Sequence, residues 1–217
     1  MTKSLTKDKL ILFDTTLRDG QQTQGVDFSV QDKINIAQAL DDMGIDYIEG
    51  GWPGANPTDT KFFEKNNHFQ NAKFTAFGMT KRAGRSADND PQLRALIDSN
   101  SDSVCLVAKT WDFHVDLALG ISLEENIDAI KDSITSVRSG GKEAMIDCEH
   151  FFDGFKSNPS FSYQCIQTSI DAGAEWVILC DTNGGTLPNE IYKIVSEVTK
   201  RFPGNKIGIH CHNDTEN

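Results

Sequence analysis

Two histidines near the end of the chain have the spacing of metal ligands. They lie in KIGIHCH (206–212), an apolar run that we interpret as a β-strand. Because successive strand side chains point to opposite faces, His210 and His212 share one face, and Cys211 between them faces the other. Two imidazoles in this arrangement can bind one divalent metal ion. The spacing leaves a second interpretation open, in which both are core histidines hydrogen-bonded to their neighbours.

A metal site of this kind needs a third ligand from another strand end. Acidic residues follow several predicted strands: Asp14, Asp19, Glu49, Glu149 and Asp181. Asp19 is a geometric possibility, because in a closed barrel the seventh strand comes near the first through the eighth. It follows Arg18, whose fixed positive charge could bind a carboxylate or a developing enolate. A salt bridge within the loop is the alternative interpretation of Arg18 and Asp19.

Seven short apolar runs alternate with amphipathic segments, which is typical of parallel βαβ units. The turn after the first run, DTTLRDGQQ, differs from the glycine-rich phosphate loop of a doubly wound sheet. We therefore predict an α/β fold, a (β/α)8 TIM barrel truncated after its seventh strand. An N-terminal extension (1–9) would precede the incomplete barrel domain (10–217). The runs are residues 10–14, 45–51, 73–79, 103–109, 144–151, 175–181 and 206–212.

Helix start signals precede three of the segments between these runs. Ser29 with Asp32, and Ser122 with Glu125, have the spacing of capping boxes. Pro188 suits the first turn of a helix. Apolar residues recur at helical spacing after each signal, so each segment should bury one face.

The composition excludes several functional classes. The formal net charge of −11 argues against a nucleic-acid partner, because phosphate binding needs a basic face. No stretch reaches the ~18 apolar residues of a membrane span, and the N-terminus has no apolar signal-peptide core. We therefore expect a cytoplasmic protein. The widely spaced cysteines indicate buried, reduced thiols rather than a disulfide framework: Cys105, Cys148, Cys165, Cys180 and Cys211.

Two signatures almost 200 residues apart carry a resemblance. DTTLRDGQQ (14–22), taken with GIHCHND (208–214), resembles the isopropylmalate, homocitrate and citramalate synthase family of the DRE-TIM metallolyase superfamily. Hydroxymethylglutaryl-CoA lyase is a relative of this family. YIEGGWPGANPTDTKFF (47–63) and CEHFFDGFK (148–156) are most similar to the citramalate synthase branch.

The resemblance implies a metal-dependent Claisen condensation of acetyl-CoA with a short 2-oxo acid. Pyruvate is the expected partner, giving (R)-citramalate, and Mn, Mg or Zn the expected metal. Asp19, His210 and His212 would hold the metal. Arg18 and Glu149 would be catalytic, and Arg18, Gln22, Glu49 and Thr182 would bind substrate. Glu49 could equally be a buried partner for Arg18. The full-length parent is expected to be a homodimer.

The resemblance also implies groups beyond residue 217, among them an asparagine metal ligand, the general base and a regulatory region. Alternatives within the class are 2-isopropylmalate synthase, homocitrate synthase and an aldol-type acyl-CoA lyase. A different alternative is a fragment that is not itself an enzyme.

Several further residues have two interpretations. The basic segment KRAGR (81–85) could meet coenzyme A phosphates or be a solvated loop. Lys109 could neutralise a substrate carboxylate or pair with Glu149 or Asp147. Trp52 and Trp111 could line the pocket or merely cover the barrel top.

Overall fold

A parallel sheet of seven strands forms the centre of the molecule. The computed structural model describes residues 9–65, 68–214 and 216. The strands pair in chain order, each parallel to the next, so β1 and β7 are the edges. Their bounds are β1 Phe13–Asp14, β2 Tyr47–Gly51, β3 Lys73–Met79, β4 Ser103–Lys109, β5 Glu143–Glu149, β6 Trp176–Asp181 and β7 Ile207–Cys211.

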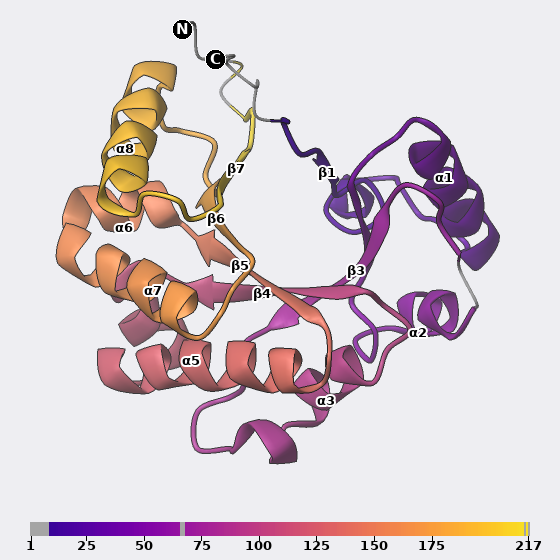
Figure 1. The fold of residues 1–217 in the computed structure, drawn as a ribbon, viewed down its shortest axis with the longest axis horizontal. Helices are drawn as coiled ribbons and strands as arrows, with labels where there is room; N and C mark the ends of the chain where they lie inside the picture. Colours follow the sequence, from indigo (N-terminus) through magenta and orange to yellow (C-terminus); the bar gives the residue numbers. More distant parts are fainter. Residues whose placement is uncertain (1–8, 66–67, 215, 217) are drawn as a thin grey trace, which may run out of the picture.

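The helices connect consecutive strands and lie on one side of the sheet (Figure 1). The longer ones are α1 Val30–Asp42, α2 Pro57–Glu64, α3 Pro91–Ile97, α5 Leu123–Ser139, α6 Phe151–Ser157, α7 Pro159–Asp171 and α8 Pro188–Arg201. Short turns of helix follow three strands: η1 Gly20–Gln22, η2 Ala87–Asn89, and α4 Asp112–His114, which continues into η3 Val115–Leu119. No helix in the described ranges is long and apolar enough to cross a membrane.

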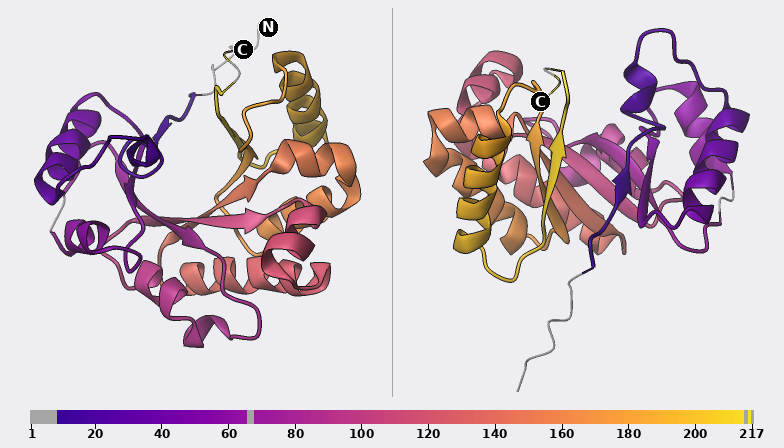
Figure 2. Two further views of the ribbon diagram at one scale, coloured as in Figure 1. Left: turned by 180° about the vertical axis from the view of Figure 1, so that it is seen from behind. Right: turned by 90° about the horizontal axis from the view of Figure 1, so that it is seen from above.

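The sheet curls so that its two edge strands face each other across an open side (Figures 1 and 2). Right-handed strand twist and outer helices produce this curvature in barrels. The predicted fold class is confirmed: these are six consecutive βα units and the seventh strand of a (β/α)8-type barrel, with every strand's C-terminal end on the same rim.

The core has two layers. The larger lies between strands and helices, and fully buried members include Ile48, Leu106 and Ile146. A smaller one fills the inside of the curl with Tyr47, Phe77, Cys105 and Met145. Both follow from the strand alternation, because each buried strand contributes side chains to the two layers in turn.

The predicted helix starts are confirmed. The Ser29 side chain accepts a hydrogen bond from the Asp32 backbone N–H, and the Ser122 side chain accepts one from Glu125. In both cases the carboxylate accepts a hydrogen bond from the backbone N–H of the serine. Pro188 is the first residue of α8. These caps satisfy backbone N–H groups that the first helical turn leaves unpaired.

Several strand bounds and one prediction about a cysteine need correction; β2, β6 and β7 are each shorter than the predicted runs 45–51, 175–181 and 206–212. The first strand covers Phe13–Asp14 instead of 10–14, because it pairs with β2 alone, and Leu10 is 79% exposed. The fifth ends at Glu149 rather than at residue 151, because His150 turns into the left-handed conformation before α6. Cys211 is exposed, so the expectation of buried thiols fails there. It lies on an edge strand whose outward side is incompletely covered, as 56% exposure of Ile209 shows.

Candidate metal centre

The loop after β1 is wound tightly around one carbonyl group. Thr15 O accepts hydrogen bonds from the backbone N–H groups of Arg18, Asp19 and Gly20 at 3.1, 2.8 and 3.1 Å. Asp14 accepts two more from Thr16. The loop therefore folds back over the C-terminal rim, where barrel active sites lie, and presents Arg18 and Asp19 there.

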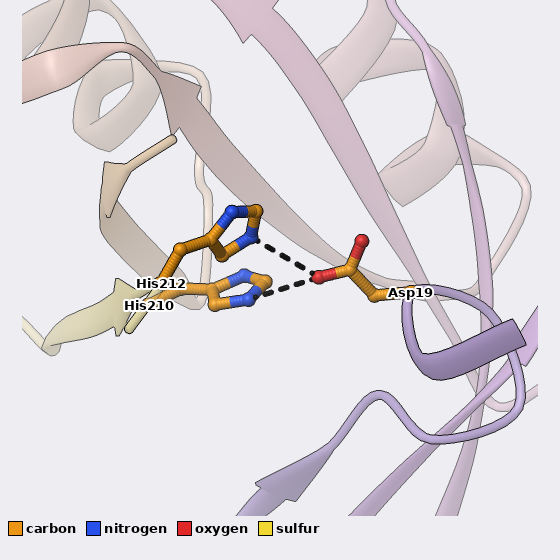
Figure 3. A group of neighbouring side chains, drawn as sticks. All are labelled: Asp19, His210 and His212. Carbon is orange, nitrogen blue, oxygen red and sulfur yellow. Dashed lines mark hydrogen bonds and ion pairs between the residues drawn. The ribbon is translucent and has the colours of Figure 1, made fainter. Parts of the chain in front are cut away.

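The three predicted metal ligands come together. His210 lies in β7 and His212 directly after it, and the alternation predicted from the sequence places both rings on the side of the curl that faces Asp19 (Figure 3). Oδ2 of Asp19 is 3.3 Å from Nε2 of His210 and 3.2 Å from Nε2 of His212. A cluster of one carboxylate oxygen and two imidazole nitrogens, all within 4.8 Å of one another, results.

These groups also shift one another's proton affinity. The hydrogen bond from His210 lowers the pKa of Asp19 to about 2, with help from the charge of Arg18 and against the effect of burial. The same bond raises the pKa of His210. The Asp19 carboxylate is therefore ionised at neutral pH and supplies a fixed negative charge.

The donor set fits a divalent cation. A carboxylate and two imidazoles suit Zn or Mn, and Mg with waters completing its shell. The Cys211 thiol, exposed on the other side of β7, is outside the cluster, as the alternation predicts. Oδ2 of Asp19 lies within hydrogen-bonding distance of both rings.

Arg18 is held by contacts on several sides. Its Nε donates to Glu49 Oε2 at 2.6 Å, its Nη1 donates to Asp19 Oδ1 at 3.1 Å, and its guanidinium carbon lies 3.9 Å from the centre of the Phe77 ring. Burial opposes its charge, but Glu49 and Asp19 outweigh that effect and raise its pKa. The loop salt bridge and the buried pair that the sequence left as alternatives are therefore both present.

Glu49 is completely buried and does not line the cavity described below. Burial raises its pKa, Arg18 opposes the rise, and the buried Asp147 adds to it. Its Oε1 has no hydrogen-bond partner in the described part of the chain. The geometry places Glu49 behind Arg18, as a group that orients the guanidinium.

A cavity of about 280 Å³ opens beside the cluster. The predicted residues Arg18, Gln22, Glu149 and Thr182 line it together with the three metal-ligand candidates. Further lining residues are Trp52, Phe77, Met79, Val107, Lys109, Asp147 and Cys180. A second hollow, lined by residues from the β1 loop and by His212, Asn213 and Asp214, adjoins it.

The structure also distinguishes between the alternative interpretations of other residues near this rim. Lys109 forms an ion pair with Glu149, and Trp52 lines the cavity whereas Trp111 does not. Arg82 and Arg85 are exposed and lie outside the cavity lining, which agrees with a solvated loop. Asp181 is buried and accepts from the backbone and hydroxyl of Thr186, so it shapes the loop after β6.

Sequence reasoning missed two supporting groups. Lys33 is completely buried, where its ammonium donates to the carbonyls of Leu17 and Gly50 and pairs with Asp59. Asp147 is buried, with a ligand atom within 4.8 Å of one on His210. Lys33 falls on the apolar side of α1, where helical periodicity predicts no charged residue. A lysine at such a position was the sequence signal for a buried, paired charge.

Known proteins place this architecture in a family. The HMGL-like family model matches residues 9–216. The chain is 50% identical over 211 residues to an (R)-citramalate synthase of Aquifex aeolicus and 46% identical over 211 residues to one of Streptomyces coelicolor. These alignments cover 96% of this chain and 40% and 39% of the relatives, so the chain spans about two fifths of their length. A 2-isopropylmalate synthase of Sulfolobus acidocaldarius is 29% identical, over 97% of this chain and 52% of that protein.

Solved structures agree on the fold. The HMG-CoA lyase of Bacillus subtilis superposes with a TM-score of 0.79 at 18% identity, covering 96% of this chain and 70% of that one. At 18% identity, this similarity supports the barrel fold alone. The family match, which spans nearly the whole chain, and the barrel with its Asp19–His210–His212 rim cluster lead to one conclusion: the chain belongs to the HMGL-like family.

Proposed function

We propose that Asp19, His210 and His212 bind one divalent cation and that the adjoining cavity takes a 2-oxo acid. The observation that carries this proposal is the convergence of two Nε2 atoms on one Asp19 oxygen at 3.2 and 3.3 Å. Bound there, a divalent cation supplies Lewis-acid polarisation of a carbonyl. A small, partly apolar cavity beside such a cluster has the form of a small-molecule site.

The reaction proposed is condensation of acetyl-CoA with pyruvate, giving (R)-citramalate. Support comes from the relatives: citramalate synthases match at 42–50% identity, and 2-isopropylmalate synthases at 29–31%. In this reaction a base removes a proton from the methyl group of acetyl-CoA, the resulting enolate carbon bonds to the ketone carbon of the 2-oxo acid, and the ketone oxygen gains negative charge and then takes up a proton. Hydrolysis of the thioester then releases coenzyme A.

Arg18 would meet the negative charge that develops on the ketone oxygen. Glu49 fixes its Nε and Asp19 its Nη1, and in the described residues its Nη2 has no protein acceptor. Donors fixed before the reaction stabilise developing charge without reorganising. Arg18 should therefore act on the oxyanion, with Glu49 as the group that orients it.

The other lining groups would recognise the substrates. Thr182 can donate its hydroxyl proton to the carboxylate of the 2-oxo acid, and Gln22 lies at the junction of the two hollows. Glu149, paired with Lys109, supplies a carboxylate to the cavity lining. The ion pair with Lys109 fixes the position of this carboxylate at the rim.

The test is a substrate comparison on the Mn²⁺-loaded chain, with coenzyme A release measured by a thiol reagent and the product resolved by chiral chromatography. Turnover that favours pyruvate over 2-oxoisovalerate and 2-oxoglutarate supports citramalate synthesis. Preference for either larger acid identifies an isopropylmalate or homocitrate synthase instead, and cleavage of a hydroxyacyl-CoA identifies a lyase.

A second candidate is a chain that binds cation and 2-oxo acid but does not turn over. The edge strands β1 and β7 favour it, because each pairs with a neighbour on one side only, and unpaired backbone groups beside the site would let Asp19 move relative to the histidines. Mn²⁺ and pyruvate binding without coenzyme A release would support this candidate. Absence of both binding and turnover would reject the proposed site altogether.

A further inference from the structure

His150 has a backbone conformation that a residue with a side chain rarely adopts. Its φ and ψ angles are 51° and 36°, in the left-handed region, directly after Glu149 at the end of β5. Elsewhere in the described ranges, Glu216 near the chain end is the other non-glycine residue with positive φ. Steric repulsion from Cβ makes this conformation unfavourable, so contacts around His150 must hold it there.

Two anchors hold it. The His150 backbone N–H donates to Thr182 Oγ1 at 2.9 Å, which links the ends of β5 and β6. Its ring Nδ1 lies 3.3 Å from Asp153 Oδ2, and because a carboxylate only accepts, Nδ1 carries the proton. Asn183 donates to the same Asp153 oxygen at 2.7 Å. The ring also packs edge-on against His114, with 4.4 Å between ring centres.

The hydrogen bond from the His150 N–H determines which role remains for the Thr182 hydroxyl. A hydroxyl group has one proton to donate and lone pairs that accept. The His150 N–H occupies the accepting side, and in the described part of the chain the Thr182 proton has no protein acceptor. Thr182 lines the cavity with Arg18 and His210, so that proton is available to a ligand there.

We propose that His150 is a positioning residue. Its left-handed backbone, held by the ring contact to Asp153, fixes the Thr182 hydroxyl as a hydrogen-bond donor to the carboxylate of the 2-oxo acid. This inference rests on the proposed function, because it assigns the acceptor to that substrate. His150 itself is absent from the cavity lining, so it acts through Thr182.

Substitutions at position 150 should separate the backbone from the ring. His150→Ala removes the ring that contacts Asp153 and keeps a Cβ, which disfavours the left-handed region. The backbone N–H of residue 150 should therefore turn away from Thr182. His150→Asn should be near wild type, because asparagine tolerates this conformation and has a donor for Asp153. His150→Gly, which adopts the conformation freely but has no ring, should lie between them.

The measurement is pyruvate affinity of the Mn²⁺-loaded chain, from the change in water-proton relaxation on titration. His150→Ala should weaken pyruvate binding ~10-fold, the usual effect of losing one hydrogen bond to a charged group. His150→Asn should stay within about twofold of wild type. Mn²⁺ affinity, measured by electron paramagnetic resonance, should not change, because His150 contacts none of the three ligand candidates.

A double-mutant cycle tests whether His150 acts through the hydroxyl. Thr182→Val removes the donor, so His150→Ala should add less than about twofold in that background. A merely structural role would give the same additional loss with or without the hydroxyl. Far-UV circular dichroism and thermal melts establish that each variant is folded, and if the alanine variant does not fold, His150→Gly replaces it in the cycle. His68→Ala, an exposed histidine between α2 and β3, is the matched control.

The outcomes separate this inference from the proposed function. Wild-type pyruvate binding with an unaffected His150→Ala variant, or equal losses in both backgrounds, overturns the role of His150 and leaves the proposed function standing. Mn²⁺ binding without pyruvate binding in the wild type overturns the proposed 2-oxo acid site, and the role of His150 with it.

Discussion

Oδ2 of Asp19 lies 3.2 Å from Nε2 of His212, although 193 residues separate them in the chain. The tight loop after β1 and the alternation of β7 bring them together, and neither depends on the other. The contact therefore bridges the open side of the sheet at its C-terminal rim. Changes that move either side should weaken the proposed metal site without unfolding the protein.

A substitution at Gly184 should displace His212 locally. It has a φ of 61°, and a Cβ there would lie 2.9 Å from His212 O and 3.0 Å from Asp214 N. Gly184→Ala should therefore push the backbone at His212 outward and weaken Mn²⁺ binding about tenfold, the cost of misplacing one ligand. Gly185→Ala is the matched control, because nothing lies within 4 Å of its Cβ position. Equal Mn²⁺ affinities for the two variants would contradict the geometry.

Glu49 should act through Arg18. Glu49→Gln keeps an acceptor for the Arg18 Nε while removing the charge, and we expect turnover with pyruvate to fall about tenfold or less. Glu49→Ala removes the acceptor and opens a cavity, and turnover should fall about a hundredfold. Glu143→Gln, at the opposite end of the barrel, is the control. A Glu49→Ala variant as active as wild type would rule out this role.

Lys33 and Asp59 form a buried pair that ties the loop after β1 to the end of β2. Lys33→Met should reduce the free energy of unfolding by about 3–5 kcal/mol, because Asp59 is left buried without its cation. The double variant Lys33→Met/Asp59→Asn should lose less than Lys33→Met alone. Urea unfolding measures both, and Lys206→Met, at an exposed pair with Glu175, is the control. A double variant less stable than Lys33→Met would show that the charge of Asp59 is not the cause.

Asp90 should make the protein sensitive to acid. Burial opposes its charge, but hydrogen bonds from the backbone N–H groups of Arg82, Leu93 and Gln92 outweigh it and lower its pKa below 3.8. A lowered folded-state pKa gives stability that is present above the unfolded value and is lost as the pH falls through the folded value. Thermal melts from about pH 5 downward should therefore show a shallower loss of stability for Asp90→Asn than for wild type. Asp88→Asn, at an exposed neighbour, should follow the wild-type curve.

Local patterns predicted much of this structure. The strands 73–79 and 103–109 match β3 and β4 residue for residue, because apolar runs between turn signals mark strands buried on both faces. Alternation predicted that His210 and His212 share one face, and barrel order made Asp19 one possible partner among the acidic residues at strand ends. The resemblance named the same residues, together with Arg18, Gln22, Glu149 and Thr182, which the structure gathers around one cavity.

Other features needed the three-dimensional contacts. The burial of Lys33 depends on carbonyls of Leu17 and Gly50, which no local pattern brings together. The left-handed turn at His150 depends on Thr182, 32 residues further along the chain. The same reason applies to Gly184, in the loop after β6, because its neighbour His212 follows a different strand, β7.

The most direct test of the account is a Mn²⁺ titration of the chain followed by electron paramagnetic resonance, in wild type and in Asp19→Asn, His210→Ala and His212→Ala. We predict one ion per chain in the wild type and about a 10–100-fold loss of affinity in each variant, as removal of one ligand removes a coordinate bond. Substoichiometric binding in the wild type, or affinities unchanged by all three substitutions, would contradict the claim that these side chains share one cation.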